Sequence, residues 1–586
     1  MIKILKFLTP KEWFMALLSL GFIVVQVWLD LKYPDYMAEI TTLVQTPESA
    51  MKDIWVAGIM MLLCTIGSLT AAIIVGYFAA IIGSALSRRL RSLLFRRVDS
   101  FSMEEINRFT TDSLITRSTN DITQIQMVVA MGLQLIIKAP ITAAWAITKI
   151  AGKGFEWTMA TGIAVFTLLL MIVILMIFVL PKFKKMQSLI DNMNRVTREN
   201  LTGLRVVRAY NAEDYQEAKY EKANDELTGT QLYTSRAMAF LMPVITMVMS
   251  GVSLSVFWIG AYLINSAQAF DRLPIFSNMM VFSIYAMQVI MSFMMLMMIF
   301  IMLPRATVSA NRISEVLDTK PTILDGSKLD GLPGLCGEVT FKNVGFKYPD
   351  ASEAVLKDVS FTVRRGETIA FIGSTGSGKS TLINLVPRFF DATEGEILID
   401  GVNIREYKLE ALHNKIGYVP QKAVMFKGTV FSNVAYGDNG KGEFTEAEVE
   451  SAISIAQGVD IIESMEGRLD GEIAQGGTNI SGGQKQRLSI ARAVCRKPEI
   501  YIFDDSFSAL DYKTDRLLRN MLKKETAGVT SMIVAQRIGT IMDADQIIVL
   551  DKGRVVGSGR HKDLLQSCEV YKQIAVSQLS EEELAS

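Results

Sequence analysis

The stretch ETIAFIGSTGSGKSTLI, residues 367–383, predicts the fold of the C-terminal half of this chain. Residues 367–372 have the apolar pattern of a buried strand, 373–378 form a glycine-rich turn, and 380–383 open an apolar helix. Such an arrangement presents free backbone N–H groups and the positive end of a helix to anionic oxygens. The sequence therefore predicts an α/β domain with a phosphate-binding loop.

The side chains of this loop predict a nucleotide with Mg²⁺ as the ligand. Lys379 is placed to reach the β- and γ-phosphates, and Ser380 is placed to coordinate Mg²⁺. Taken alone, the loop suits a GTPase or a small-molecule kinase equally well. The residues assigned to nucleotide binding here are Gly373, Ser374, Thr375, Gly376, Ser377, Gly378, Lys379, Ser380 and Thr381.

Length and composition predict a membrane part joined to a soluble part. The chain has 586 residues, too many for one core, and 50% of them are hydrophobic. Its formal net charge is zero, so no basic excess indicates nucleic acid as a partner. The four cysteines have no metal-ligand spacing and are interpreted as reduced structural thiols; they are Cys64, Cys336, Cys495 and Cys568.

Six long apolar stretches predict six membrane-spanning helices. Each is near or above the roughly 20 residues that a hydrocarbon core requires. They cover residues 13–29, 54–87, 122–148, 157–180, 237–265 and 273–303. We expect a transmembrane domain over residues 1–318, a linker over 319–335 that contains prolines and glycines, and a soluble domain over 336–586.

Basic residues predict the orientation in the membrane. The loops that follow the second and fourth stretches are rich in arginine and lysine, whereas the charged residues between 30 and 53 are mostly acidic. Because basic loops stay on the cytoplasmic side, both termini, both loops and the soluble domain are expected inside the cell. Between residues 183 and 232 apolar side chains recur at three- and four-residue intervals without a proline, which predicts helices that extend beyond the membrane.

The run ISGGQ, residues 480–484, favours another class of nucleotide-binding protein over a GTPase or a small-molecule kinase. Here the chain resembles the ATP-binding cassette (ABC) family, whose members carry an LSGGQ-type signature before a helix; only Ile480 departs from that pattern. The resemblance implies that ATP is the nucleotide and that the site is shared by two subunits. The residues implied to contact ATP held by the other subunit are Ser481, Gly482, Gly483 and Gln484.

Further residues match the family in its order along the chain. The resemblance implies that Tyr348 stacks on adenine, the alternative being an ordinary aromatic residue on an edge strand. It also implies that Gln421 and Asp504 join Ser380 around Mg²⁺.

Two positions depart from the family where hydrolysis is driven. Asp505 follows Asp504 where the family places the glutamate that polarises water, and Gln536 stands where the family places a switch histidine. The aspartate is shorter by one methylene and the glutamine cannot become a cation, so this site is expected to bind ATP well and to hydrolyse it slowly. The alternative is that aspartate suffices.

The six spans fused to a cassette resemble an ABC exporter half-transporter of the multidrug type in a bacterial cytoplasmic membrane. Pairing with a related chain that carries glutamate and histidine predicts a heterodimer that moves small amphipathic or hydrophobic compounds. A homodimeric exporter, a slow lipid flippase and a regulatory ATP-binding subunit are the alternatives. The methionine-rich sixth span and the two lysines of the third, Lys138 and Lys149, leave packing and cargo roles open.

Overall fold

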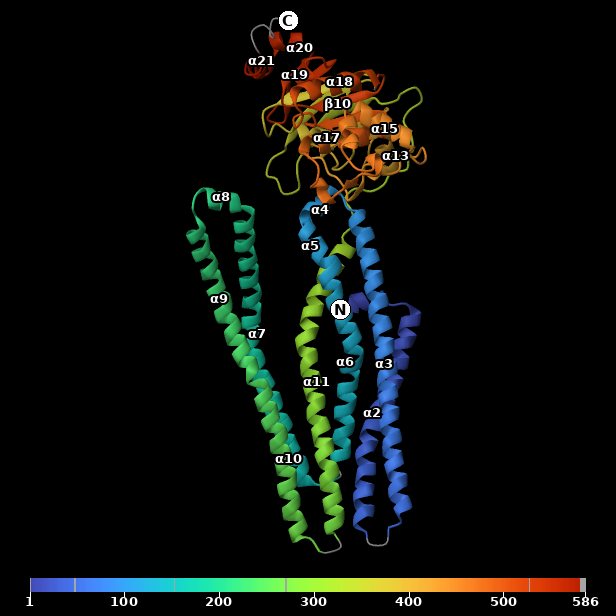
Figure 1. Ribbon diagram of the computed structural model, residues 1–586, viewed down its shortest axis with the longest axis vertical. Helices are drawn as coiled ribbons and strands as arrows, with labels where there is room; N and C mark the ends of the chain where they lie inside the picture. The colour runs from blue at the N-terminus through green and yellow to red at the C-terminus, as the bar shows by residue number, and fades with distance from the viewer. Residues whose placement is uncertain (1, 47–48, 152, 269–270, 526, 580–586) are drawn as a thin grey trace. The chain divides into compact units, whose positions relative to one another are not determined.

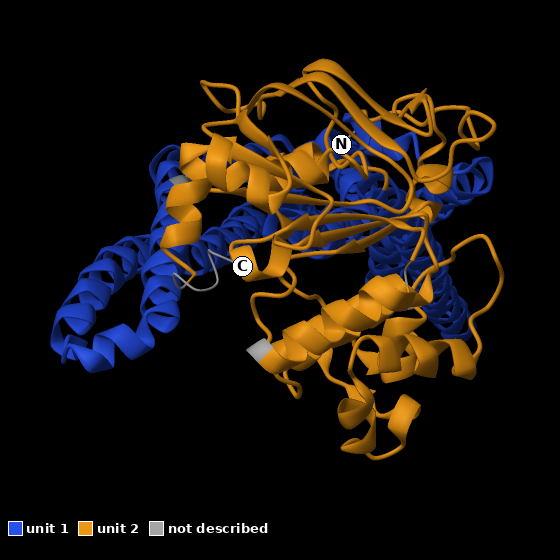
Figure 2. Ribbon diagram, turned by 90° about the horizontal axis from the view of Figure 1, so that it is seen from above, with its two compact units in different colours: residues 1–99, 112–319 blue, residues 100–111, 320–586 orange. Residues whose placement is uncertain are grey.

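The computed structural model describes residues 2–46, 49–151, 153–268, 271–525 and 527–579. The chain divides into two compact units, which Figure 2 colours separately. One unit comprises Met1–Asp99 and Asp112–Thr319 and is helical, and the other comprises Ser100–Thr111 and Lys320–Ser586. The short segment Ser100–Thr111 thus groups with the C-terminal residues.

Within the described residues, six helices are long and apolar enough to cross a membrane, which confirms the predicted six-span architecture (Figure 1). They contain α2 (Pro10–Gln45), α3 (Met51–Asp99), α6 (Ile122–Ile150), α7 (Phe155–Thr202), α10 (Leu241–Ser266) and α11 (Arg272–Asp318). A proline at the first position and a capping box start α2, in which Thr9 accepts from the Glu12 N–H and Glu12 accepts from the Thr9 N–H.

The helix α2 extends well past the predicted end at residue 29 and includes Pro34. The charges that ended the predicted stretch are paired with the neighbouring helix α6. Asp30 and Asp35 lie 3.1 and 2.7 Å from the ammonium groups of Lys138 and Lys149. Because these pairings join residues far apart in the sequence, hydropathy alone could not show that the helix continues.

Helices also extend beyond the apolar stretches, as the pattern over residues 183–232 predicts. The helix α7 continues to Thr202, and α9 (Glu213–Ala239) leads back to α10, with the short helix α8 (Leu204–Ala209) between α7 and α9 (Figure 1). Gly203 and the left-handed Asn211, with φ of 48°, mark the two breaks. The result is a long pair of helices joined by a short one.

The C-terminal unit is built on a parallel sheet that carries the phosphate loop. The described strands follow the order β12 (Arg554–Gly559), β11 (Gln546–Asp551), β3 (Thr368–Gly373), β10 (Thr530–Val534), β9 (Ile500–Asp504) and β6 (Ile416–Val419). Only the pairing of β11 with β12 is antiparallel. Because β3, β9 and β10 run parallel, their carboxyl ends meet at one edge of the sheet, which is where ligands bind in such folds.

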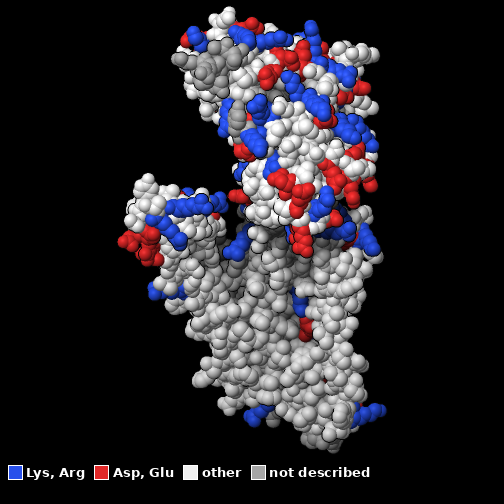
Figure 3. All heavy atoms as spheres, turned by 45° about the horizontal axis from the view of Figure 1, so that its top comes forward, with Lys and Arg blue, Asp and Glu red and all other residues white. Residues whose placement is uncertain are grey.

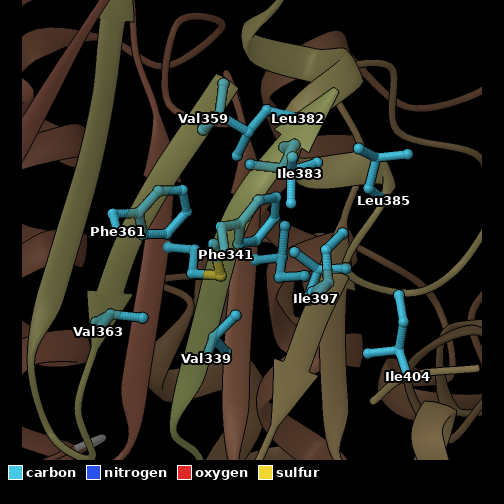
Figure 4. Packing of buried hydrophobic residues seen from close by; sticks show 14 of the residues in the cluster. Val339, Phe341, Val359, Phe361, Val363, Leu382, Ile383, Leu385, Ile397 and Ile404 are labelled. Atoms are coloured by element: carbon cyan, nitrogen blue, oxygen red, sulfur yellow. The ribbon is translucent and has the colours of Figure 1, made fainter. Parts of the chain in front are cut away.

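A second, antiparallel sheet packs its apolar face into the core. It has the order β2 (Leu356–Val363), β1 (Val339–Phe346), β4 (Glu394–Ile399) and β5 (Val402–Asn403). Phe341 and Phe361 from adjacent strands stack with ring centroids 4.5 Å apart, and Leu382 and Ile383 of the helix α12 (Lys379–Asn384) lie close to them (Figure 4). This packing holds the start of α12 directly after the phosphate loop. The unit is the predicted α/β nucleotide-binding domain.

Candidate nucleotide-binding site

The glycine loop between β3 and α12 has a backbone conformation that residues with a side chain rarely adopt. Gly376 and Gly378 have φ values of 83° and 99°, in the left-handed region that favours glycine. A Cβ atom on Gly378 would lie 2.8 Å from the side chain of Leu356. The loop therefore needs glycine at this position both for its turn and for its close approach to β2.

Lys379 lies over this loop and contacts its backbone. Its Nζ donates to the carbonyl oxygens of Gly373 and Ser374, each at 2.8 Å. Burial lowers the pKa of the Lys379 ammonium group below its usual value, against the opposing influence of Asp505 and Asp504. The ammonium group is thus held next to the loop, where a bound polyphosphate would supply the negative charge that compensates its burial.

Ser380 and Asp504 form a pair of hard oxygen donors that fits Mg²⁺. The Ser380 hydroxyl donates to Oδ1 of Asp504 at 2.8 Å, and Asp504 ends β9 with only 5% of its surface exposed. Burial raises the pKa of Asp504 above its usual value, and the charge of Asp505 adds to this, whereas Ser380 and Lys379 oppose it. A buried carboxylate with a raised pKa gains from a nearby cation, so these residues fit the predicted metal, which would bind and orient phosphate oxygens.

Asp505 is held by two amide side chains. Its Oδ2 accepts hydrogen bonds from Nε2 of Gln536 at 2.7 Å and from Nε2 of Gln421 at 3.1 Å. The backbone of Asp505 is left-handed, with φ of 46°, and its N–H donates to Val534 at the end of β10. The two positions that depart from the family are therefore in direct contact with each other, and one carboxylate oxygen is fully occupied by amide donors.

Tyr348 packs beside the start of α12. Its hydroxyl lies 3.1 Å from Oγ1 of Thr381, and its ring meets those of Phe346 and Phe390 edge-on at 4.8 and 5.4 Å. The half-buried ring is thus located next to the residues that follow the phosphate loop. Stacking on adenine remains a prediction.

The signature residues begin the helix α17 (Gly482–Cys495). Ser481 caps this helix by accepting from the Gln484 N–H at 3.3 Å, while Oε1 of Gln484 accepts from the Ser481 N–H at 2.8 Å. Across the described residues, no hydrogen bond joins residues 481–484 to Lys379, Ser380 or Asp504. Ser481 and Gly482 are exposed, and a Cβ atom on Gly482 would meet nothing within 4 Å. This helix start is therefore open to a ligand from outside.

Sequence reasoning missed Ser506, which positions the acidic pair. Its buried hydroxyl donates to the carbonyl oxygen of Val419 at 3.1 Å and so ties the end of β9 to the end of β6. Gln421 follows Val419 by two residues, so this bond also places the glutamine near Asp505. The only available signal was a serine directly after two aspartates.

Comparison with known proteins agrees with the geometry of both units. The family model described as ABC transporter matches residues 356–508, and that described as ABC transporter transmembrane region matches residues 16–293. An uncharacterised ABC transporter ATP-binding protein of Mycobacterium tuberculosis is 39% identical over 89% of this chain and 87% of its own length. One from Bacillus subtilis is 33% identical over 99% of both chains.

Two further similarities concern proteins with a described role. An ATP-dependent lipid A-core flippase of Pseudomonas fluorescens is 30% identical over 85% of this chain and 81% of its own length. The solved structure of a bacterial Atm1-family ABC exporter with ATP bound is 25% identical, with a TM-score of 0.78 over 97% of this chain and 98% of that one.

Proposed function

Because this chain belongs to the ABC transporter family, we propose that it is the catalytically weak half of a heterodimeric exporter. Its membership establishes the coarser function: it is an exporter half-transporter, a multi-pass membrane protein whose cytoplasmic domain couples ATP hydrolysis to transport. The proposal adds a division of labour. This chain supplies a slow ATP site of its own and a signature that completes the active site of a related partner.

The contact between Asp505 and Gln536 carries the proposal. A carboxylate that polarises an attacking water must present a free oxygen at the right distance, and errors near 1 Å can cost roughly a hundredfold in rate. In this chain the carboxylate is shorter than glutamate, and Gln421 and Gln536 both donate to its Oδ2, so Oδ1 alone is left for water and the two amides fix its position. An amide at position 536 also provides no positive charge toward the γ-phosphate.

The intact signature supports a partner rather than a loss of function. Residues 481–484 keep the serine and two glycines, the cap of α17 is complete, and the helix start is exposed. Backbone N–H groups at such a start bind phosphate oxygens. A chain that paired only with itself would place a weak catalytic pair in both composite sites.

Steady-state ATPase activity tests the proposal. The chain should be purified alone, with its genomic neighbour if that encodes a related chain, and as the Asp505→Glu/Gln536→His double variant. We expect low turnover alone, a rise of at least about tenfold with the partner, and a similar rise in the homomeric double variant. Brisk hydrolysis by the unmodified chain alone would contradict the proposal.

The two single variants serve as matched controls. Asp505→Glu restores the carboxylate length but leaves Gln536 as a donor to it, and Gln536→His restores the switch residue opposite a short carboxylate. We expect each single change to recover less than the double change, because the two side chains touch. Additive effects of the two changes would mean that the contact has no catalytic consequence.

A homodimeric lipid flippase is the second candidate. The similarity to a protein described as an ATP-dependent lipid A-core flippase favours it. Loss of all transport in Lys379→Ala, measured without any partner, would support this candidate. A regulatory subunit that moves no cargo would instead bind ATP and never support transport in any combination.

We further propose small amphipathic or hydrophobic compounds as cargo, which the methionine-rich helix α11 supports only in part. Met279 is 5% exposed and packs in the core of the helical unit, whereas Met291 and Met298 are 46% and 54% exposed. Thioether side chains adapt to varied apolar surfaces. The methionines of α11 therefore divide between internal packing and exposed positions that suit adaptable contacts.

A further inference from the structure

The charged residues of α7 and α9 are all basic where the predicted membrane spans end. Residues 175–190 of α7 contain three lysines, residues 227–241 of α9 and the start of α10 contain one arginine, and neither range contains an aspartate or a glutamate. The helix α10 packs against both helices and carries no charged residue, and α11, which also contacts α7, has no acidic residue before Glu315. The charge of this region is therefore positive on each of these four helices that carries any.

Two of these cations, Lys182 and Arg236, have no carboxylate of their own. Among the described residues, no aspartate or glutamate lies within ion-pair distance of either side chain, and both side chains are exposed. Nearer the end of the helix pair, in contrast, Arg195 and Lys219 lie 3.8 and 2.9 Å from the carboxylate of Glu199. Along the visible face of this pair in Figure 3, acidic groups lie near its end and a basic group lies closer to the apolar part. Lys182 and Arg236 are thus available to an anion.

An open groove of about 630 Å³ runs between α7 and α9 at this place; we call it the α7–α9 groove. The residues of α9 that line it recur at three- and four-residue intervals from Gly229 to Phe240, so they form one stripe along the helix. Eleven residues of helix correspond to about 16 Å. The groove is therefore long and narrow, and it extends from the cytoplasmic part of α9 to the predicted start of the fifth span.

The two ends of the α7–α9 groove differ in chemistry. Phe178 and Phe240 line the end inside the predicted spans, with 60% and 71% of their surfaces exposed. Tyr233 and Arg236 line the other part and share one face of α9, because they are three residues apart. The Nζ of Lys182 lies 5.3 Å from the centroid of the Tyr233 ring. Two cations therefore flank the cytoplasmic part of a groove whose membrane end is aromatic and apolar.

These features indicate the kind of ligand. The volume falls within the range of about 300–1,000 Å³ that is typical of small-molecule sites. A guanidinium group binds phosphate oxygens with two parallel hydrogen bonds, and basic pockets between helices on the cytoplasmic side suit the headgroups of anionic lipids. Without a nearby carboxylate, nothing in the described region would bind the ammonium group of a zwitterionic headgroup. The charges therefore favour a lipid with a net negative charge.

We propose that the α7–α9 groove binds an anionic phospholipid of the cytoplasmic leaflet. The phosphate accepts hydrogen bonds from Arg236 and Lys182, and one acyl chain lies over Phe178 and Phe240. This lipid is a resident of the membrane and not the cargo, so the inference goes beyond the proposed export function. It does not depend on a heterodimer, because every residue that contacts the lipid comes from this chain.

Photolabelling of the full-length chain in phosphatidylcholine nanodiscs tests the proposal without ATP hydrolysis. The probes are trace amounts of phosphatidylglycerol or phosphatidylcholine that carry the same diazirine in one acyl chain. Mass spectrometry of the digested protein measures the labelling of residues 174–179 and 237–240, the apolar end of the groove. The ratio of the two labels corrects for any loss of folded protein.

The variants remove or keep one charge at a time. Lys182→Gln and Arg236→Gln each remove a cation beside the groove, whereas Arg236→Lys keeps the charge. Lys222→Gln is the matched control, because Lys222 is an exposed cation of α9 that lies fourteen residues before Arg236, about 21 Å along the helix. This control changes the net charge of the protein by the same amount, away from the groove.

We expect phosphatidylglycerol to label the groove about tenfold more than phosphatidylcholine, and each glutamine variant at the groove to lower this preference about three- to fivefold. Arg236→Lys should retain most of the preference, and Lys222→Gln should retain all of it. Equal labelling by both probes, or an unchanged preference in Lys182→Gln and Arg236→Gln, would overturn the proposal.

A second subunit packed into the groove is the other possible occupant. It would exclude both lipids, so an absence of label from residues 174–179 and 237–240 would also overturn the proposal. Brisk ATPase activity of the chain alone would refute the heterodimer and leave this inference standing.

Discussion

Two consecutive carboxylates, Asp504 at the end of β9 and Asp505 directly after it, have different surroundings because the chain leaves the strand conformation at Asp505. Asp504 receives the hydroxyl of Ser380, the residue predicted to bind Mg²⁺, while Asp505 turns into a left-handed conformation and receives two amides. The surroundings of Asp504 therefore suit a bound cation, whereas the side chain of Asp505 is held in place by hydrogen bonds.

Asp504→Asn should stabilise the protein at neutral pH in Mg²⁺-free buffer. The folded state raises the pKa of Asp504, so between the ordinary value of about 3.9 and the raised value the folded state binds more protons, and stability falls as the pH rises. Asparagine removes this penalty and still accepts from Ser380. We expect a melting temperature about 2–4 °C higher at pH 7, with the gain shrinking as the pH falls toward 4.

Asp511→Asn is the control with the opposite sign. Asp511 is exposed and accepts from the Thr514 N–H at 2.9 Å, and this hydrogen bond lowers its pKa below the usual value. Its contribution to stability is therefore present above the ordinary pKa and is lost in acid. A fall in melting temperature for Asp504→Asn at pH 7, like that expected for Asp511→Asn, would contradict the assigned environment of Asp504.

At the scale of elements, hydrogen bonds and ion pairs of buried polar side chains hold short segments within the nucleotide-binding unit. Glu105 in the helix α4 (Met103–Phe109) accepts from the Ser102 N–H at 2.7 Å and from the Thr322 N–H at 3.0 Å. One side chain therefore caps a helix and also ties it to the segment that follows α11. This explains why Ser100–Thr111 groups with the C-terminal residues.

Glu105→Ala should loosen α4 without unfolding the sheet. The change leaves two backbone donors without partners and should cost about 1–2 kcal/mol locally. Hydrogen exchange over residues 100–111 should accelerate while exchange in β3 and β9 stays slow. Glu104→Ala, a change at the neighbouring first-turn position, is the control. Equal protection of α4 in both variants would show that the buried contact does not hold the helix.

Lys415 holds the segment around Asp330 in place by forming ion pairs with three carboxylates. Its Nζ lies 2.8 Å from Asp330, 3.1 Å from Asp400 and 2.9 Å from Glu499. Lys415→Met should destabilise the protein by about 3–5 kcal/mol, because it leaves the fully buried Asp400 charged and unpaired. Thermal unfolding checks this loss. Adding Asp400→Asn should recover part of it, and no recovery would show that the destabilisation comes from packing.

The sequence predicts where helices and strands form better than it predicts which side chains contact one another. Six helices followed from runs of apolar residues, and the strand, loop and helix around Lys379 followed from local pattern and glycine positions. The extension of α2 through Asp30 and Asp35 could not be predicted, because their partners lie more than 100 residues away. The contact between Asp505 and Gln536 was likewise hidden, although both residues were singled out, because it depends on β9 and β10 being adjacent.

For the whole molecule, the exposed signature and the hydrogen-bonded Asp505 predict different consequences for two single substitutions. Gly482→Glu places a negative charge at the start of α17, where phosphate would bind, and open space around Gly482 leaves the fold undisturbed. Asp505→Asn alters a site that is already slow. In the complex with a catalytically complete partner, Gly482→Glu should lower ATPase activity at least about a hundredfold, and Asp505→Asn should lower it less than about threefold.

Steady-state ATPase activity of complexes with matched ATP occupancy provides the measurement, and unchanged melting temperatures verify folding. The asymmetry follows only if the signature of this chain serves an active site whose catalytic carboxylate comes from the other subunit. Similar losses in the two variants would mean that both composite sites hydrolyse ATP at comparable rates, in which case Asp505 is an adequate base and the hydrogen bonds from Gln421 and Gln536 open during turnover.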